Sequence, residues 1–453
     1  MLVRRGVLDS STATTILEPP KPPDPCDHFP DLAKAIVRLQ GACQIAESVA
    51  ICGDYDADGM TSTALLMVTL KCLGAQPIAA IPNRKSEGYG LNRDMVTRLH
   101  EQGIRLIVTV DNGVTAQEAL QQAENLSMEV ILTDHHTLPD SPLNVLCLLH
   151  PSVTPQDSPY RCLAGVGLAY LLASSLAEAM DCKEAIGPAR DLFCIGTVAD
   201  MAPLTGANRA FLREGLNNLH RTRCKGLRAL QRLAGIEERP LKAEDIGFQL
   251  APRINAVGRL GDPQLVVKLL TVDNEDEAMT LARQCDQLNR QRKDLCNAIE
   301  AEAIALVEAE GATPPPFLML AQNHWHHGVI GIVAARLMER YFRPTALLAG
   351  EGDGRLRASV RAPSGFAVND SLKACAVHLD RFGGHSAAGG FTIRAEKVGA
   401  LHEALNELAR KWHATVGGGV SISPETLLKL HEINLDLWNG LQKLEPFGIG
   451  HPA

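Results

Sequence analysis

The sequence predicts an α/β protein with two α/β lobes that are joined by a long helix and separated by a cleft. From Ser48 onward, the short apolar runs SVAIC, AAI, LIVTV and EVILT alternate with helix-like segments, a rhythm typical of a parallel sheet with crossover helices. The stretch NEDEAMTLARQCDQLNRQRKDLCNAIEAEAIALVEAEG has the pattern of one continuous helix running into Gly311. After the loop-like ATPPP, the apolar run FLMLA begins a second α/β unit.

These patterns divide the chain into five segments. Residues 1–47 form an N-terminal arm, with the proline-rich EPPKPPDPCDHFPD, and a helix around Leu32 to Leu39. Residues 48–202 form the first α/β domain, and residues 203–311 form a helical connector that ends in the long bridging helix. Residues 312–417 form the second α/β domain, with further strands at TALLAG and GGFTI, and residues 418–453 form a final segment.

Composition indicates a globular protein of the cytoplasm. The chain has 453 residues with ordinary composition, and its twelve cysteines are dispersed without C-x-x-C spacing, which favours reduced thiols. No apolar stretch approaches the length of a membrane span, and the start MLVRRGVLDSST lacks the apolar core of a secretory signal. We therefore expect an intracellular protein that does not bind membranes.

Charge and aromatic content restrict how the chain would bind nucleic acid. A formal charge of −8 argues against a globally basic coat, although it allows a locally basic channel around an acidic site. The 4% aromatic content argues against extended platforms for base stacking. Contacts to backbone phosphates would have to dominate.

The stretch AICGDYDADGMTS places three aspartates, Asp54, Asp56 and Asp58, at alternate positions directly after an apolar run. In an extended chain these positions project from one face. Two unit charges about 5 Å apart repel by roughly 3 kcal/mol at an effective dielectric constant of about 20. The cluster therefore needs protonation, basic partners or a cation, and a hard metal ion is the simplest compensation.

Polar residues follow other apolar runs in the same way. LIVTV leads to Asp111, EVILT leads to Asp134, His135 and His136, and CIGTVA, interpreted as another strand, leads to Asp200. Ligands bind beyond the carboxyl ends of parallel strands, where these residues would converge. Each aspartate alone is also explained as a helix cap or turn residue, and the two histidines as a capped turn with one packed ring. Four such coincidences in one domain favour a metal site.

Aspartate and histidine without cysteine suit two divalent ions with oxygen and imidazole ligands, as in two-metal phosphoryl hydrolysis. We expect manganese or magnesium ions rather than structural zinc.

The motifs DYDADG, VTVDNG, TDHH and GTVADMAPL together resemble the DHH phosphoesterase superfamily. Further motifs, LAGVGLAYLLA, APRINAVGRLGDP, HWHHGVIGIVAARL, SVRAPSGF and FGGHSAAGGF, resemble its RecJ-like group of bacterial single-strand-specific exonucleases, from about Leu17 onward. This resemblance implies a DHH catalytic domain over 48–202 and a DHH-associated substrate-binding domain over 312–417. It also implies that 418–453 begins an oligonucleotide-binding domain, for which the sequence up to Ala453 is too short, as in a fragment or a shortened natural form.

The resemblance implies a role for each residue of the acidic cluster. The ligands of one metal match Asp56, Asp111, His135 and Asp200. The ligands of the second metal match Asp54 and Asp111, so Asp111 would bridge the two ions. His136 would contact the scissile phosphate or orient a ligand.

Three positions around this set carry further expectations. Asp58 caps the helix that follows it or holds water on a metal, and the role of Asp134 stays open. Many phosphatases of the superfamily have a histidine four residues before the first aspartate, where this chain has Ala50. The second metal should therefore bind more weakly, a departure that RecJ-like members share.

Substrate-binding residues also follow from the resemblance. Four of them would bind the 5′-terminal phosphate and the adjoining backbone: Arg84, Arg259, Ser359 and Arg361. Further candidates for contacts to the DNA backbone are Arg253, His326, Gly384 and His385. The alternatives are a surface ion pair for any one arginine, a strand-connecting turn for RFGGHSAAGGF, and a structural role for HWHHGVIG.

The function that these expectations imply is hydrolysis of single-stranded DNA from the 5′ end to mononucleotides, in DNA repair and recombination. The enzyme would be a monomer that works with repair and single-strand-binding proteins. One alternative is a short-oligonucleotide or nucleotide phosphohydrolase of the same superfamily, which usually lacks the APRINAVGR connector and the long helix. Another is a non-catalytic replication scaffold, a kind of relative that can lose the aspartates that this chain retains.

Overall fold

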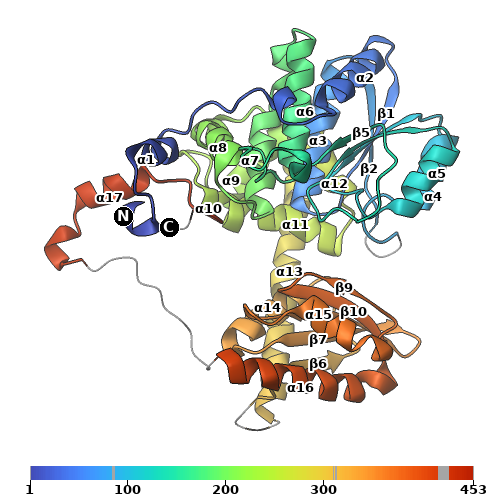
Figure 1. Cartoon of the computed structure of the whole chain (residues 1–453), viewed down its shortest axis with the longest axis vertical. Helices are drawn as coiled ribbons and strands as arrows, with labels where there is room; N and C mark the ends of the chain where they lie inside the picture. The colour runs from blue at the N-terminus through green and yellow to red at the C-terminus, as the bar shows by residue number, and fades with distance from the viewer. Residues whose placement is uncertain (1, 84–86, 310, 312–313, 417–427, 452–453) are drawn as a thin grey trace. The chain divides into compact units, whose positions relative to one another are not determined.

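The computed structural model describes residues 2–83, 87–309, 311, 314–416 and 428–451. The chain divides into two compact units, unit 1 (residues 1–289 and 425–453) and unit 2 (residues 290–424). Helix α13 (Glu275–Ala309) runs from unit 1 into unit 2 (Figure 1). Each unit contains its own sheet, so the predicted α/β class with two units joined by a long helix is confirmed. The cleft between them stays a prediction.

Unit 1 is built on a parallel sheet with the strand order β2-β1-β3-β4-β5. Its strands are β1 (Ser48–Cys52), β2 (Gln76–Ala80), β3 (Leu106–Val110), β4 (Glu129–Thr133) and β5 (Cys147–Leu149). The runs SVAIC, LIVTV and EVILT form strands with the predicted bounds. From β1 the chain moves to β2 on one side and then returns to β3 on the other side. The topological switch point therefore lies between β1 and β3, where ligands of such sheets bind.

Helices cover both faces of this sheet and form a further layer beside it. The helices of unit 1, before α13, are α1 (Ser10–Leu17), α2 (Leu32–Gln44), α3 (Ala57–Cys72), α4 (Arg93–Glu101), α5 (Gln117–Asn125), α6 (Gly165–Ala179), α7 (Ala189–Ala199), α8 (Gly206–Asn218), α9 (Lys225–Ala234), α10 (Ala243–Asp245), α11 (Ala251–Leu260) and α12 (Gln264–Thr271). Short 3-10 turns occur at Leu2–Arg5, Pro25–Asp27, Pro151–Val153, Lys183–Ile186 and Leu219–Arg221, and a π-helical turn occurs at Ile246–Leu250.

Residues of the strands alternate between two hydrophobic cores. In β1, Val49 and Ile51 belong to the core that includes α2, α3 and α6, whereas Ala50 and Cys52 belong to the core with α4 and α5. This alternation is the period of two that a strand imposes. Because helices cover both faces, β3 is buried along its whole length.

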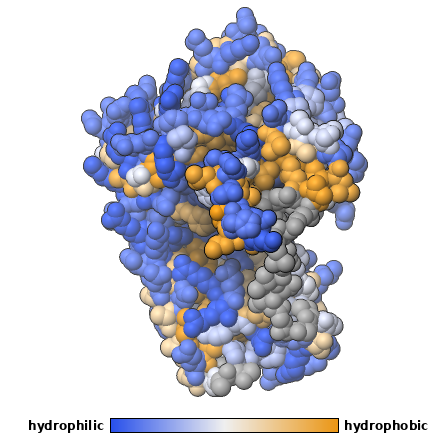
Figure 2. Space-filling view, turned by 90° about the vertical axis from the view of Figure 1, so that its left-hand side faces the viewer, coloured by the Kyte–Doolittle hydropathy of each residue, from blue (hydrophilic) through white to orange (hydrophobic). Residues whose placement is uncertain are grey.

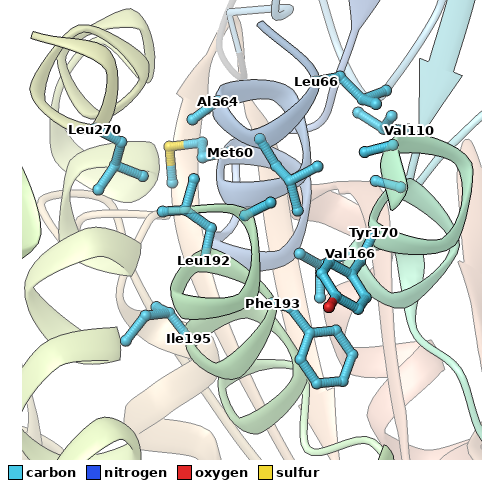
Figure 3. Packing of buried hydrophobic residues seen from close by; sticks show 14 of the residues in the cluster. Met60, Ala64, Leu66, Val110, Val166, Tyr170, Leu192, Phe193, Ile195 and Leu270 are labelled. Atoms are coloured by element: carbon cyan, nitrogen blue, oxygen red, sulfur yellow. The ribbon is translucent and has the colours of Figure 1, made fainter. Parts of the chain in front are cut away.

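Helix α7 packs against α3 and α6 inside the larger core. Figure 3 shows Met60 of α3, Val166 of α6 and Phe193 of α7 gathered in this packing. The run CIGTVA, expected to be a strand before Asp200, is the last part of this helix, so that expectation is wrong. The run is short and mostly apolar, and over such a length the periods of a helix and of a strand look alike in sequence.

Unit 2 contains a mixed sheet with the strand order β6-β7-β8-β10-β9. After α13, its elements are β6 (Leu318–Gln322), α14 (Ile330–Tyr341), β7 (Thr345–Gly352), β8 (Arg355–Arg361), α15 (Val368–Ala374), β9 (Arg381–Gly384), β10 (Ala388–Arg394) and α16 (Val398–Val416), with 3-10 turns at Ala376–His378 and Ala395–Lys397. Strands β6 and β7 pair in parallel and the others pair antiparallel. Ala358 and Val360 face the core that contains α16, so Ser359 between them faces the opposite side, toward α14.

Residues 428–451 belong to unit 1 and contain a 3-10 turn (Leu430–Glu432), helix α17 (Leu435–Gln442) and a bridge between Gly448 and His451. Several large apolar side chains of this segment are exposed, among them Leu435 and Trp438. Figure 2 views the side of the molecule where Figure 1 shows α1 and α17, and hydrophobic surface lies there among hydrophilic surface. Among the described residues, which include every cysteine, no disulfide occurs, and no described helix has the length and apolar character to cross a membrane.

Candidate active site

The site begins where β1 ends. The strand stops at Cys52 and α3 begins at Ala57, so the three aspartates do not share one face of an extended strand. Asp56 is the N-cap of α3, and its Oδ1 accepts a hydrogen bond from the Gly59 N–H at 3.0 Å. A Cβ on Gly59 would lie 2.6 to 2.8 Å from backbone atoms of Asp54. The absence of a side chain at Gly59 therefore lets the aspartate-bearing turn fold back onto its own helix.

Asp58 lies inside α3 and is buried. It caps another helix, because its two carboxylate oxygens accept hydrogen bonds from the N–H groups of Gly165 at 2.8 Å and Val166 at 2.7 Å, in the first turn of α6. The expectation that Asp58 caps the helix that follows it is wrong, since Asp56 does so. Burial raises the pKa of Asp58 well above its usual value, and the nearby carboxylates of Asp200 and Asp56 add to the shift.

Asp111 and Asn112 follow β3, next to the end of β1. Asp111 is buried and has a φ of 61°, a strained conformation for a residue other than glycine. The Asn112 amide nitrogen donates to the carbonyl oxygens of Cys52 and Val110, each at 2.9 Å, and so ties the ends of β1 and β3 together. Burial raises the pKa of Asp111 well above its usual value, and the charge of Asp58 contributes next. Asp111 therefore projects from the switch point of the sheet.

Asp134 follows β4 and positions the two histidines after it. Its Oδ1 accepts hydrogen bonds from the N–H groups of His135 at 2.7 Å and His136 at 3.0 Å, and lies 2.8 Å from Nδ1 of His136. Its Oδ2 accepts from the Val114 N–H at 3.0 Å. Burial alone would raise the pKa of Asp134, but the hydrogen bond from His136 and the backbone N–H groups outweigh it, so the pKa is lowered. Asp134 is therefore ionised, and its hydrogen bonds hold the turn that carries His135 and His136.

The two histidines differ in charge. Burial lowers the pKa of His135 to about 4, so its ring is neutral near pH 7 and has a free lone pair. The hydrogen bond with Asp134 raises the pKa of His136, which favours its protonated form. The Tyr89 hydroxyl donates to the carbonyl oxygen of Asp111 at 3.1 Å and lies 3.4 Å from Nε2 of His136. Sequence analysis missed Tyr89, because no motif marked it.

Asp200 reaches the site from the C-terminal end of helix α7. Burial, and then the charge of Asp56, raises the pKa of its carboxyl to about 7. A carboxylate oxygen of Asp200 lies with one of Asp58 and a ring nitrogen of His135 in one group of possible metal ligands.

Three groups of side chains bring their ligand atoms within 4.8 Å of one another: Asp54, Asp56 and Asp111; Asp58, His135 and Asp200; and Asp111, His135 and His136. Asp111 and His135 each belong to two of these groups. Asp111 Oδ1 and His135 Nε2 are buried 3.0 Å apart, and neither has a hydrogen-bond partner among the described residues. Oxygen and imidazole ligands without thiolates suit Mg²⁺ or Mn²⁺, so the donor set fits the expected ions.

These groups differ from the expected ligand sets. Asp58 takes the place of Asp56 beside His135 and Asp200, and Asp56 lies instead with Asp54 and Asp111. Asp111 and His135 form a further group with His136, which was not expected to be a ligand. The assignment of each residue to one ion stays a prediction.

The expected substrate-binding residues lie in several places. Arg84 is outside the described residues. Arg253 of α11 pairs with Asp286 of α13 at 2.9 Å, and both side chains are largely buried, which favours the ion-pair alternative for this arginine. Arg259 is at the end of α11.

In unit 2, Ser359 and Arg361 both lie beside the first turn of α14, because a Cβ on Gly331 would be 3.2 Å from Nη2 of Arg361 and 3.4 Å from Oγ of Ser359. His326 precedes α14, and its Nδ1 accepts from the Gly328 N–H at 3.1 Å. A helix N-terminus with an arginine and a hydroxyl group suits an anion such as phosphate.

Gly384 is the last residue of β9, and His385 begins the turn to β10. The His385 N–H donates to the carbonyl oxygen of Ala388 at 2.8 Å, and Gly384 has a φ of 148°. His385 is exposed. The strand-connecting turn that we considered as an alternative is therefore present, and the exposed ring leaves a phosphate contact as a prediction.

Family comparisons agree with this arrangement. The family model of the DHH family, N-terminal domain, matches residues 48–197, and that of the DHHA1 domain matches residues 315–411. The single-stranded-DNA-specific exonuclease RecJ of Escherichia coli is 35% identical, over 86% of this chain and 70% of the relative. The chain belongs to the RecJ family. The RecJ protein of Bacillus subtilis is 36% identical over 100% of this chain, which spans only 57% of that relative.

Solved RecJ structures have the same fold. RecJ of Thermus thermophilus in complex with Mn²⁺ superimposes with a TM-score of 0.86 at 31% identity, covering 100% of this chain and 64% of that one. An exonuclease RecJ bound to manganese gives a TM-score of 0.74 at 33% identity, covering 84% of this chain and 95% of that one.

Proposed function

We propose that this chain is a metal-dependent exonuclease that degrades single-stranded DNA from its 5′ end and releases mononucleotides. The observation that carries the proposal is the buried cluster at the switch point of unit 1, where Asp111 and His135 each belong to two groups of possible metal ligands. RecJ relatives are single-stranded-DNA-specific exonucleases, and their solved structures contain Mn²⁺ or Mg²⁺.

We propose the following ligand roles. Asp54, Asp56 and Asp111 hold one ion, and Asp58, His135 and Asp200 hold the other. Asp111, which also lies in a group with His135, is shared by both ions. When bound, such ions lower the pKa of water and neutralise charge on the phosphoryl oxygens. Burial, and then mutual repulsion, raises the pKa values of Asp58, Asp111 and Asp200, and a bound cation favours their ionised forms.

His136 supplies the positive charge on the substrate side of the cluster. Asp134 fixes its ring and favours the protonated form, so Nε2 can donate a hydrogen bond to a phosphoryl oxygen. Tyr89 lies beside this nitrogen.

Unit 2 selects the 5′ end of the DNA strand. The N-terminus of α14, Ser359 and Arg361 bind a terminal phosphate, which carries more charge and more oxygens than an internal phosphodiester. We further propose that the protein acts in the cytoplasm as a monomer, together with repair and single-strand-binding proteins.

Cleavage of single-stranded DNA that is labelled at its 5′ end or at its 3′ end tests this function. We expect that a 5′-phosphorylated single strand of 40 nucleotides, incubated with Mn²⁺, releases its 5′ label as mononucleotide at the earliest time points. The 3′-labelled strand shortens one nucleotide at a time, and a blunt duplex and an EDTA-treated sample stay intact. Release of labelled oligonucleotides would indicate an endonuclease. Cleavage restricted to substrates of two to five nucleotides would indicate a short-oligonucleotide hydrolase, and no cleavage would indicate a scaffold.

A further inference from the structure

Helix α11 contacts the loop that carries the aspartates through Asn255. The Asn255 Oδ1 atom accepts a hydrogen bond from the Ala57 N–H at 2.8 Å, across 198 residues of sequence. Ala57 is the first residue of α3 and lies between Asp56 and Asp58. The APRINAVGR motif therefore supplies a polar contact to the proposed metal site in addition to its two arginines.

This contact adds a second side-chain acceptor to the cap of α3. The first N–H groups of a helix have no partner within the helix and need acceptors from elsewhere. Asp56 Oδ1 accepts from the Gly59 N–H at 3.0 Å, and Asn255 accepts from the Ala57 N–H. Among the residues that the structure describes, the carboxylate of Asp56 thus accepts from one backbone N–H, that of Gly59.

A second contact makes α11 a firm support for the loop. A Cβ on Gly258 would lie 1.7 Å from the carbonyl oxygen of Tyr55, so the helix approaches the loop backbone as closely as a glycine allows. On its other side, α11 is anchored to α13 by the ion pair between Arg253 and Asp286 at 2.9 Å. These two contacts fix the position of α11, and with it the position of the Asn255 amide.

We propose that Asn255 is a positioning residue for the metal site, which holds the peptide between Asp56 and Asp58 in the conformation that binds metal. This inference rests on the proposed metal-dependent function. Without the amide oxygen, the Ala57 N–H needs another acceptor, and it then competes with the metal for the carboxylate of the preceding Asp56. The loss should weaken metal binding and leave the chemical step at saturating metal largely unchanged.

The test uses the full chain and measures metal binding without DNA. We compare wild type, Asn255→Ala, Asn255→Asp and the control Ile254→Val, a buried change at the neighbouring position of α11 that keeps the Asn255 amide. Calorimetric titration with Mn²⁺ gives the Kd, thermal unfolding in EDTA gives the Tm, and initial cleavage rates are recorded against Mn²⁺ concentration.

We expect Asn255→Ala to raise the Kd and the half-saturating Mn²⁺ concentration about 10-fold, with the rate at saturating Mn²⁺ within about threefold of wild type. Asn255→Asp keeps an oxygen acceptor at the same place and should restore the Kd to within about threefold. Ile254→Val should lower the Tm without changing the Kd.

Two results would overturn the inference: a Kd for Asn255→Ala within about twofold of wild type, whatever its Tm, or an Asn255→Asp variant as weak as Asn255→Ala. Wild-type protein that binds no Mn²⁺ would instead refute the proposed function, and the inference with it.

Discussion

Asp58 is the residue whose role the structure changes most, and its replacement by alanine gives a quantitative test. Its two carboxylate oxygens accept hydrogen bonds from the N–H groups of Gly165 and Val166 at 2.8 and 2.7 Å. The side chain is buried, so water does not replace it as an acceptor. Alanine at this position leaves both N–H groups without their acceptor.

The expected cost follows from these two bonds. A buried polar group left without its partner costs about 1–3 kcal/mol, so two groups cost about 2–6 kcal/mol. Removing the charge of Asp58 also relieves its repulsion with Asp200 and Asp56, which moves the net loss toward about 2–3 kcal/mol. For a unit of roughly 300 residues, 1 kcal/mol corresponds to about 1.5 °C, so the Tm should fall by about 3–5 °C.

Scanning calorimetry in EDTA measures this effect without a contribution from metal binding. The matched control is Asp200→Ala, which removes a carboxylate of the same cluster that makes no side-chain hydrogen bond among the described residues. We expect the Tm of the control to stay the same or to rise. Equal shifts of the Tm in both variants would refute the reasoning, because the loss would then come from charge and not from the cap of α6.

Three further predictions concern the metal site, end recognition and pH. Asp111→Ala should lower cleavage of a labelled single strand below about one per cent of wild type at any Mn²⁺ concentration, a loss of about 2.7 kcal/mol or more; higher activity would exclude a ligand shared by both ions. Arg361→Ala should lower kcat/KM about 10- to 150-fold for a 5′-phosphorylated strand, and much less for a 5′-hydroxyl strand; equal losses would place Arg361 on an internal phosphate or in a structural role. Burial raises the pKa of Asp191 to about 6, so its ionisation costs stability as pH rises from about 4 to 6. Asp191→Asn should therefore raise the stability by up to about 3 kcal/mol at pH 8 and by little at pH 4, and a difference in Tm that is independent of pH would contradict this.

The sequence predicted the parts of the fold that repeat a short pattern. Strands β1, β3 and β4 are apolar runs of five residues, each followed by polar residues, so both the strands and their common edge could be predicted. The long helix α13 could be predicted as well, because it keeps helical character over 35 residues. Helix α7 could not, because the mostly apolar run before Asp200 is too short to separate the period of a helix from that of a strand.

The contacts that position the site could not be predicted in the same way. Asp58 binds the first turn of α6, more than 100 residues later, and Asn255 binds Ala57 across 198 residues. A cap is predictable when donor and acceptor are three residues apart, as for Asp56 and Gly59. When the acceptor comes from another element, only the packing of that element brings the two together.

Three helices meet the acidic cluster with different ends. Helices α3 and α6 begin there, and α7 ends there, at Asp200. The N-terminus of a helix carries a partial positive charge and its C-terminus a partial negative charge. Asp56 and Asp58 therefore lie at two helix ends with partial positive charge, which stabilise the two carboxylates in the absence of a metal ion. Asp200 instead adds its carboxylate to a helix end with partial negative charge, and a cation is needed to offset that charge. The same fold thus keeps the carboxylates together in the metal-free protein and leaves an electric field that draws divalent ions into the site.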